Sequence, residues 1–191
     1  VGHDRERAHQ TYEAMVNEAP EHALARQSRW SIASYDGDST ACLRCIEQLW
    51  ARFPDDTFLL SAKLCCLQTL GRREERLQLL KDSCDNGYAS PFLWQRYAAE
   101  LSEDAREDRQ AIGLLRRAIR FQPDEGAFRI LAGILWRRRD IDKALALYRF
   151  AVCRDDKEEQ SARAYFVASR HRKRSFETLQ FLEARFERYG K

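Results

Sequence analysis

Apolar and polar side chains follow a helical period over much of the chain, and the pattern is clearest in two neighbouring segments. In residues 125–139 the apolar side chains recur three and four residues apart, and those of residues 140–152 do the same. One helical turn takes about 3.6 residues, so each set lies on a single helical face. A charged turn containing Asp140 joins the two segments. We therefore expect an antiparallel helical hairpin over residues 125–152.

Small and large side chains alternate on one face of the second segment, at Ala144, Tyr148 and Ala151. Small side chains allow a neighbouring helix to approach closely. A single hairpin of this size buries too little apolar surface to be stable alone. We therefore expect the hairpin to recur along the chain.

Proline positions indicate the interval at which the hairpin recurs. Pro20 and Pro54 are 34 residues apart, and acidic residues suited to a helix N-terminus follow each of them. A further 34 residues reach Tyr88, and Pro123 lies one residue beyond the next interval. We assign the extra residue to an insertion in the loop of residues 102–109. The pattern of the second helix recurs at Ala8, Tyr12, Met15, then Cys42, Ile46, Leu49, then Ala111, Leu115, Ala118, then Ala144, Tyr148, Ala151.

With this repeat the chain resembles the tetratricopeptide repeat (TPR) family, whose unit of about 34 residues carries W-x2-L-G-x2-Y, then A-x3-F-x2-A and a closing proline. The best-matching repeat has Phe128, Leu131, Ala132, Leu135, Ala144, Tyr148 and Ala151. A second has Trp94, Tyr97, Ala98, Leu101, Ala111, Leu115, Ala118 and Pro123. The resemblance covers nearly the whole chain and is degenerate in the remaining units. The half-a-TPR (HAT) repeats of RNA-processing scaffolds share the Trp94 and Tyr97 pattern and are the second choice.

The resemblance implies an all-α fold, a right-handed superhelical solenoid of antiparallel helical hairpins. We expect a single repeat domain over residues 1–191, with about five repeats of which the first is half-complete. Val1 falls inside what resembles the second helix of a repeat, so we expect the chain to be a fragment of a longer protein.

Composition agrees with a helical globular chain. Hydrophobic residues make up 44% and charged residues 33%, with only four prolines and eight glycines among 191 residues, which favours long helices. The sequence has no apolar run near the roughly 18 residues that a membrane span needs, and we expect no membrane partner.

Six cysteines raise the question of metal binding. Cys42 and Cys45 have a zinc-type spacing, and Cys65 and Cys66 supply two further thiols. However, these cysteines fall within expected helices, and Cys42 occupies a small-residue position where a thiol packs as an apolar group. We therefore expect no metal and no disulfide, and thiols that favour a cytoplasmic location.

The sequence offers no candidate catalytic residues. The four histidines have no paired metal-ligand spacing, and neither a nucleophile motif nor a glycine-rich phosphate loop is present. We therefore expect no enzyme activity and no cofactor.

Charge is distributed unevenly along the chain. Residues 1–112 hold 14 basic and 19 acidic side chains, a net charge of −5, whereas residues 113–191 hold 19 basic and 11 acidic, a net charge of +8. A basic region of this kind attracts acidic protein segments or nucleic-acid phosphate. The basic residues gather at Arg116, Arg117, Arg120, residues 137–139, Arg154 and residues 171–174.

The resemblance also implies which residues line a ligand groove, because the first helices of TPR hairpins form the concave surface. The corresponding positions are Leu24, Gln27, Ser31, Ser34, Tyr35; Phe58, Ser61, Cys65, Gln68, Thr69; Phe92, Gln95, Ala99, Ser102, Glu103; Gly126, Arg129, Gly133, Trp136, Arg137; and Gln160, Arg163, Val167, Arg170, His171. An aromatic ring beside arginines is typical of a peptide-binding hot spot.

Our leading hypothesis is a protein-interaction scaffold that binds a protein or peptide ligand, expected to be acidic, in the groove of its C-terminal repeats. The expected partner-binding residues are Phe92, Gln95, Arg129, Trp136, Arg137, Arg163 and Arg170. The alternative is a HAT-like nucleic-acid-binding module, in which the same arginines contact phosphate and Phe92 or Trp136 stacks on bases. The acidic N-terminal half makes nucleic acid the less favoured partner. A third hypothesis is self-association through an exposed end of the repeat stack.

Overall fold

The computed structural model describes residues 2–19, 37–86, 90–154 and 159–189. Within these ranges it contains ten α-helices, one short 3-10 helix and no strand. Pro20 and Tyr88, two of the residues that suggested the repeat interval, lie outside the described residues. None of the described helices is both long and apolar enough to cross a membrane.

The chain divides into two compact units, Val1–Leu79 and Leu80–Lys191, with the boundary inside α5. The first unit contains α1 (Gly2–Glu18), α3 (Ser39–Arg52), α4 (Thr57–Thr69) and the start of α5 (Arg73–Asp85). The second contains the end of α5, then α6 (Pro91–Leu101), η1 (Ala105–Glu107), α7 (Asp108–Phe121), α8 (Glu125–Arg137), α9 (Ile141–Arg154), α10 (Gln160–Arg170) and α11 (Ser175–Tyr189). The single repeat domain over residues 1–191 stays a prediction.

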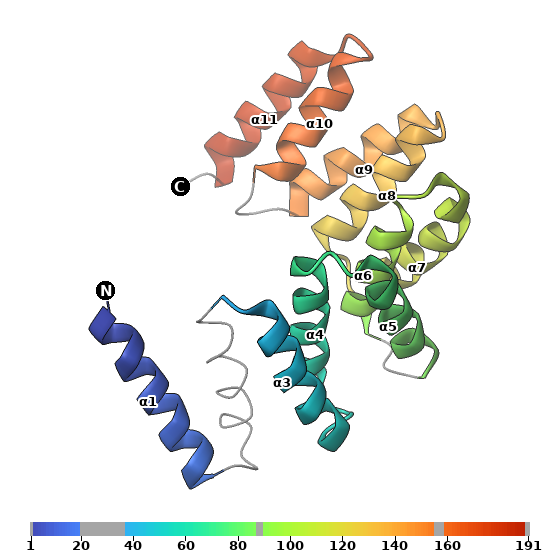
Figure 1. Ribbon diagram of the computed structural model, residues 1–191. Coiled ribbons are helices and arrows are strands. Elements are labelled where there is room, and N and C mark those ends of the chain that lie inside the picture. The colour runs from blue at the N-terminus through green and yellow to red at the C-terminus, as the bar shows by residue number, and fades with distance from the viewer. Residues whose placement is uncertain (1, 20–36, 87–89, 155–158, 190–191) are drawn as a thin grey trace. The chain divides into compact units, whose positions relative to one another are not determined.

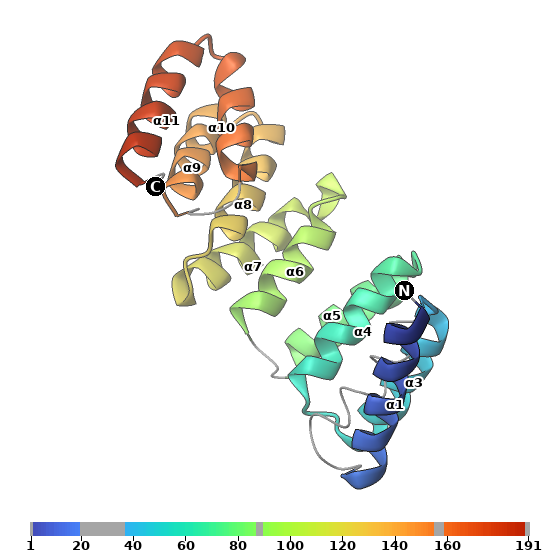
Figure 2. The ribbon, with the colours of Figure 1, turned by 90° about the vertical axis from the view of Figure 1, so that its left-hand side faces the viewer.

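Consecutive helices of the second unit pair into hairpins, α6 with α7, α8 with α9, and α10 with α11 (Figures 1 and 2). The first helix of each hairpin also contacts the next along a row, since α8 touches both α6 and α10. This arrangement gives the unit two layers, one of first helices and one of second helices. The hairpin expected over residues 125–152 corresponds to α8 and α9.

Side-chain caps determine where several of these helices begin. Asp38, Asp56 and Asp124 each accept hydrogen bonds from two backbone N–H groups in the first turn of α3, α4 and α8. Ser90 accepts one such bond at the start of α6, where Pro91 follows as the first helical residue. Caps of this kind each stabilise a helix by about 1 kcal/mol.

The turns that precede α3, α5, α9 and α11 each contain a residue with the same backbone geometry, at the expected interval. Gly37, Gly71, Arg139 and Lys173 all have positive φ angles, of 74°, 69°, 66° and 57°. After each of the last three, the next residue donates a backbone hydrogen bond to the carbonyl oxygen five residues back. These bonds run from Arg72 to Leu67, from Asp140 to Leu135 and from Arg174 to Ser169. Successive positions among the four differ by 34, 68 and 34 residues, so the turns show the repeat independently of the prolines.

The loop of residues 102–109 departs from this geometry, but not through an insertion. The helices α4, α6 and α8 begin at residues 57, 91 and 125, so the 34-residue interval continues across this loop. The expected inserted residue is therefore wrong. The loop is longer because α6 ends early at Leu101 and residues 105–107 form η1. The proline positions suggested an extra residue because Pro123 lies two residues before α8, whereas Pro54 lies three residues before α4.

The residues that matched the repeat pattern form the core of the second unit. Ala98, Ala111, Ala132, Ala144 and Ala151 have no exposed surface, as expected for side chains that let helices approach closely. The larger residues Trp94, Tyr97, Leu115, Phe128 and Leu131 are buried around them. The two best-matching repeats therefore supply most of this core.

In the first unit, α3 packs against α4 through a smaller apolar cluster. Cys42, Leu43 and Ile46 of α3 are buried against Cys66 and Leu67 of α4. The Cys66 thiol donates to the Cys42 sulphur at 3.3 Å. Cys42 thus packs as a small apolar group. None of the six cysteines forms a disulfide.

Candidate functional site

The expected groove residues of the second unit lie on the row of first helices, α6, α8 and α10, except Ser102, Glu103 and His171, which directly follow α6 and α10. The earlier positions Leu24, Gln27, Ser31, Ser34 and Tyr35 lie outside the described residues. Among the described residues, no group of three or more histidine, cysteine or acidic side chains is placed to hold a metal ion. The predicted contact residues fall into an inward-facing group and an exposed group.

Gln95 belongs to the inward-facing group because it packs over the backbone of the next first helix. A Cβ atom built at Gly126 would lie 2.5 Å from the Nε2 atom of Gln95, so the end of this side chain lies directly over the Gly126 backbone. Gly126 is buried and Gln95 is half-buried. This predicted contact residue therefore contacts α8 from α6.

Arg129 is also directed into the protein. Its Nε atom is 3.8 Å from Oε2 of Glu125, and the same carboxylate oxygen accepts a hydrogen bond of 2.9 Å from Ser161 of α10. Ser161 is completely buried. Burial raises the pKa of the nearby Tyr148 hydroxyl, while the positive charge of Arg129 acts in the opposite direction. The Glu125 carboxylate thus links Arg129 of α8 to Ser161 of α10.

Trp136, Arg137 and Arg170 come together around the exposed side chain of His171. The rings of Trp136 and His171 are edge to face, with centroids 5.4 Å apart. One hollow of about 350 Å³ is lined by Trp136, Arg137, Arg139, Ile141 and His171. A second, of about 330 Å³, is lined by Val167, Arg170 and His171. We call this pair the His171 hollows; they lie where α8 and α10 end.

Arg137 differs from its neighbours because it pairs with a buried acid. Its guanidinium forms an ion pair and hydrogen bond with Asp108, the first residue of α7, whose side chain is only 8% exposed. Among the described residues, Arg139 and Arg170 make no ion pair, and both side chains are exposed. Arg139 and Arg170 are therefore the cations of this surface that remain open to a ligand.

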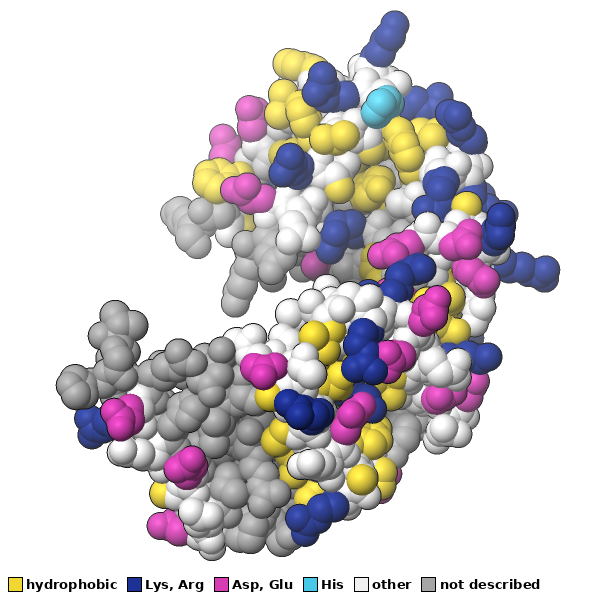
Figure 3. Space-filling view, in the orientation of Figure 1, with side chains coloured by type: hydrophobic (Ala, Val, Ile, Leu, Met, Phe, Trp, Pro, Cys, Tyr) yellow, Lys and Arg dark blue, Asp and Glu magenta, His cyan; other side chains and the backbone are white. Residues whose placement is uncertain are grey.

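The other two predicted contact residues lie apart from the His171 hollows. Phe92 of α6 is 49% exposed, and the Arg96 guanidinium lies 5.3 Å from its ring centroid. Arg163 of α10 is exposed but lines neither hollow. Lys and Arg side chains are numerous over the end of this unit that holds α8 to α11 (Figure 3).

Sequence reasoning chose neither His171 nor Arg139 as contact residues. His171 was among the groove positions implied by the resemblance. Its position in its repeat corresponds to that of Arg137, next to Trp136, in the preceding repeat, and this was the available signal. Arg139 lies in the turn, where the pattern of helical faces gives no guidance, and its signal was its place in the basic run of residues 137–139. Asp108, the partner of Arg137, is 29 residues away along the chain, and no local pattern links the two.

Comparison with known proteins bears on the fold. No family model and no curated protein matches the chain. Similar solved structures include MamA from Desulfovibrio magneticus RS-1, 16% identical with a TM-score of 0.67, covering 85% of this chain and 92% of that chain. They also include the TPR protein TTC0263 of Thermus thermophilus, which is 19% identical with a TM-score of 0.65. This match covers 86% of this chain and 90% of that chain.

A third similar structure is that of YrrB, described as a TPR protein with an unusual peptide-binding site. It is 13% identical, with a TM-score of 0.62, and covers 92% of this chain and 91% of that chain. At these identities the likeness concerns the fold. Together with the all-helical architecture, it confirms the expected all-α class: the chain has the TPR-like helical-repeat fold.

Proposed function

We propose that this chain is a protein-interaction scaffold without catalytic activity, and that its second unit binds an acidic peptide or partner segment at the His171 hollows. The fold class supports the general role, because repeat solenoids present extended surfaces to partners. The structural neighbour YrrB is described as having a peptide-binding site. Fold alone does not determine function, so the proposal depends on the surface itself.

The observation that carries the proposal is the meeting of two hollows at His171, between an aromatic ring and two exposed guanidinium groups. Trp136 supplies rigid apolar area, which a peptide side chain covers at little entropic cost. Arg139 and Arg170 supply fork-shaped donors that match a carboxylate. The net charge of +8 over residues 113–191 adds long-range attraction for an acidic segment.

The most direct test reverses the two exposed cations and leaves the ion pair of Arg137 intact. We would capture partners from nuclease-treated lysate with the wild-type chain and with the Arg139→Glu/Arg170→Glu variant. The matched control is Arg116→Glu/Arg120→Glu, which makes the same change in charge at exposed positions of α7. Proteins retained by the wild type and the control but lost by the first variant would support the proposal.

Two outcomes would contradict it. If all three chains retained the same proteins, the His171 hollows would not be the binding surface. If nucleic acid were recovered without nuclease and lost only from the Arg139→Glu/Arg170→Glu variant, the same arginines would recognise phosphate instead. Equal melting temperatures of the three chains would exclude unfolding as the cause of any difference.

A further inference from the structure

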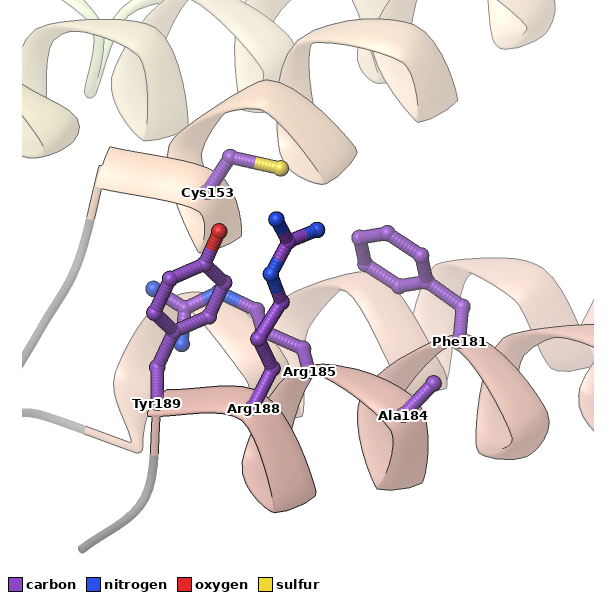
Figure 4. Close-up of a pocket in the computed structure, with 6 residues that line it drawn as sticks. All are labelled: Cys153, Phe181, Ala184, Arg185, Arg188 and Tyr189. Carbon is purple, nitrogen blue, oxygen red and sulfur yellow. The ribbon is translucent and has the colours of Figure 1, made fainter.

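A separate hollow of about 320 Å³ lies between the end of α9 and the second half of α11. It is lined by Cys153, Phe181, Ala184, Arg185, Arg188 and Tyr189. Figure 4 shows Arg188 and Tyr189 extending from α11 toward the last turn of α9, which carries Cys153. We call it the α9–α11 hollow. It belongs to the layer of second helices and shares no residue with the His171 hollows.

Guanidinium groups lie against the two aromatic rings of this hollow. The Arg149 Cζ atom is 4.5 Å from the ring centroid of Phe181, and the Arg188 Cζ atom is 5.3 Å from that of Tyr189. A guanidinium held against a ring keeps its N–H edge available for bidentate hydrogen bonds. The contact also limits the side chain's rotamers, so less entropy is lost when an anion binds.

Arg149 and Arg188 bring positive charge to this hollow. No acidic residue is among the six lining residues. Within the described parts of the chain, neither Arg149 nor Arg188 makes an ion pair. Phe181, Ala184 and Tyr189 meanwhile form an apolar wall beside these cations. A complementary ligand would bring a carboxylate and an apolar group together.

We propose that the α9–α11 hollow binds a short acidic peptide segment, with a carboxylate on Arg188 and a neighbouring apolar side chain against Phe181 and Tyr189. A volume near 320 Å³ is at the small end of ligand sites and suits one or two side chains. This proposal is independent of the ligand proposed for the His171 hollows. It would give the scaffold acidic-segment sites on both layers of helices.

Cys153 provides a reporter, because this exposed thiol lines the hollow, and the exposed Cys65 of the first unit is an internal reference. In the full chain, alkylation of each thiol by anionic iodoacetate and by neutral iodoacetamide would be measured by peptide mass spectrometry. In both reactions the sulphur–carbon bond forms as iodide leaves, and the thiol proton passes to buffer. We expect the iodoacetate-to-iodoacetamide rate ratio to be at least about threefold higher at Cys153 than at Cys65.

The binding probe is the peptide acetyl-Asp-Glu-Phe-Asp-Glu-amide, with the Asn and Gln analogue of the same length as its control. The acidic peptide should slow iodoacetamide labelling of Cys153 and leave Cys65 unaffected, whereas the neutral analogue should protect neither thiol. Arg188→Gln should abolish both the protection and the preference for iodoacetate. The matched variant Arg116→Gln, at an exposed position of α7, should preserve them.

Three results would overturn the proposal: no protection by the acidic peptide, equal protection in Arg188→Gln, or equal protection by oligothymidylate, which would indicate a general polyanion surface. The Arg139→Gln/Arg170→Gln variant separates this site from the proposed function. This variant should lose binding at the His171 hollows, but the acidic peptide should still protect its Cys153. Failure of the groove proposal would likewise leave the Cys153 result standing.

Discussion

At the scale of single residues, Arg137 shows how a side chain expected to bind a ligand can be used by the fold. Its guanidinium neutralises the buried carboxylate of Asp108, while Arg139, two residues later, makes no ion pair among the described residues. An exposed ion pair contributes little to stability, but an acid left buried without its partner is costly. The two arginines should therefore respond differently to substitution.

We predict that Arg137→Ala lowers the free energy of unfolding by about 1–3 kcal/mol, a value reduced from that of a fully buried pair because Arg137 is 40% exposed. Arg139→Ala should change it by less than about 0.5 kcal/mol. Urea denaturation of both variants measures these values. Adding Asp108→Asn to Arg137→Ala should recover part of the loss. Equal effects of the two arginine variants would show that the Asp108 pair contributes nothing.

A second prediction concerns the thiol of Cys42. Burial is the largest cause that raises the pKa of this thiol from 9.0 to about 12. The folded state therefore favours the protonated thiol. This contribution is fully present below pH 9 and is lost as the pH rises from 9 toward 12, by up to about 1.4 kcal/mol per pH unit.

Urea unfolding between pH 8 and about pH 10.5 would test this alkaline loss in the wild type and in Cys42→Ala. The alanine variant lacks the thiol, so the wild type should lose stability faster with rising pH. Parallel curves for the two proteins would contradict the prediction.

At the scale of elements, the helices follow from the sequence and the connection in residues 102–107 does not. The sequence predicted α8 and α9 from the helical period of apolar residues, the capping residues and the small residues. Each of these signals depends on neighbours within about one turn of helix. The early end of α6 and the turn of η1 have no such local signal. The same limit applies to the site. The resemblance brought Trp136 and Arg170 into one groove, but Asp108 pairs with Arg137 from a distant part of the chain.

The turns give a prediction at this scale, because Arg139 and Lys173 adopt the left-handed conformation that glycine has at the equivalent Gly71. A side chain in this region carries a backbone cost that glycine avoids. Lys173→Gly should therefore raise the free energy of unfolding by about 0.5–1 kcal/mol. Gly71→Ala should lower it by a similar amount, since nothing lies within 4 Å of the added Cβ and only the backbone is strained.

Thermal unfolding of the two turn variants would measure both changes. Ser175→Gly, two residues beyond Lys173 and at the start of α11, is the control. Glycine at that helical position should destabilise instead. A loss of stability in Lys173→Gly would show that contacts of the lysine outweigh the backbone cost.

At the scale of the whole molecule, stability should be unevenly distributed within the second unit. Six residues of α8 are buried, whereas Thr178 is the one buried residue of α11. Phe176 and Phe186 of α11 are largely exposed. In a repeat protein each hairpin is stabilised mainly by its neighbours, so a helix with few buried side chains opens more readily.

We predict that backbone amides of α11 exchange with solvent at least about tenfold faster than those of α8, because opening α11 exposes much less apolar surface. Hydrogen exchange followed by mass spectrometry would measure this. Helix α9, whose buried residues include Ala144 and Ala151, is the internal control and should exchange as slowly as α8. Equal protection of α8 and α11 would show that the unit opens as a single cooperative block.

The edge-to-face contact of Trp136 with His171 also gives the candidate site an optical property. Indole emission depends on the polarity around the ring. A ligand that enters the hollow would replace water beside a half-buried indole. The protein thus carries its own fluorophore at the surface where we place the partner, and the difference spectrum between the wild type and Trp136→Phe would follow occupancy without a label.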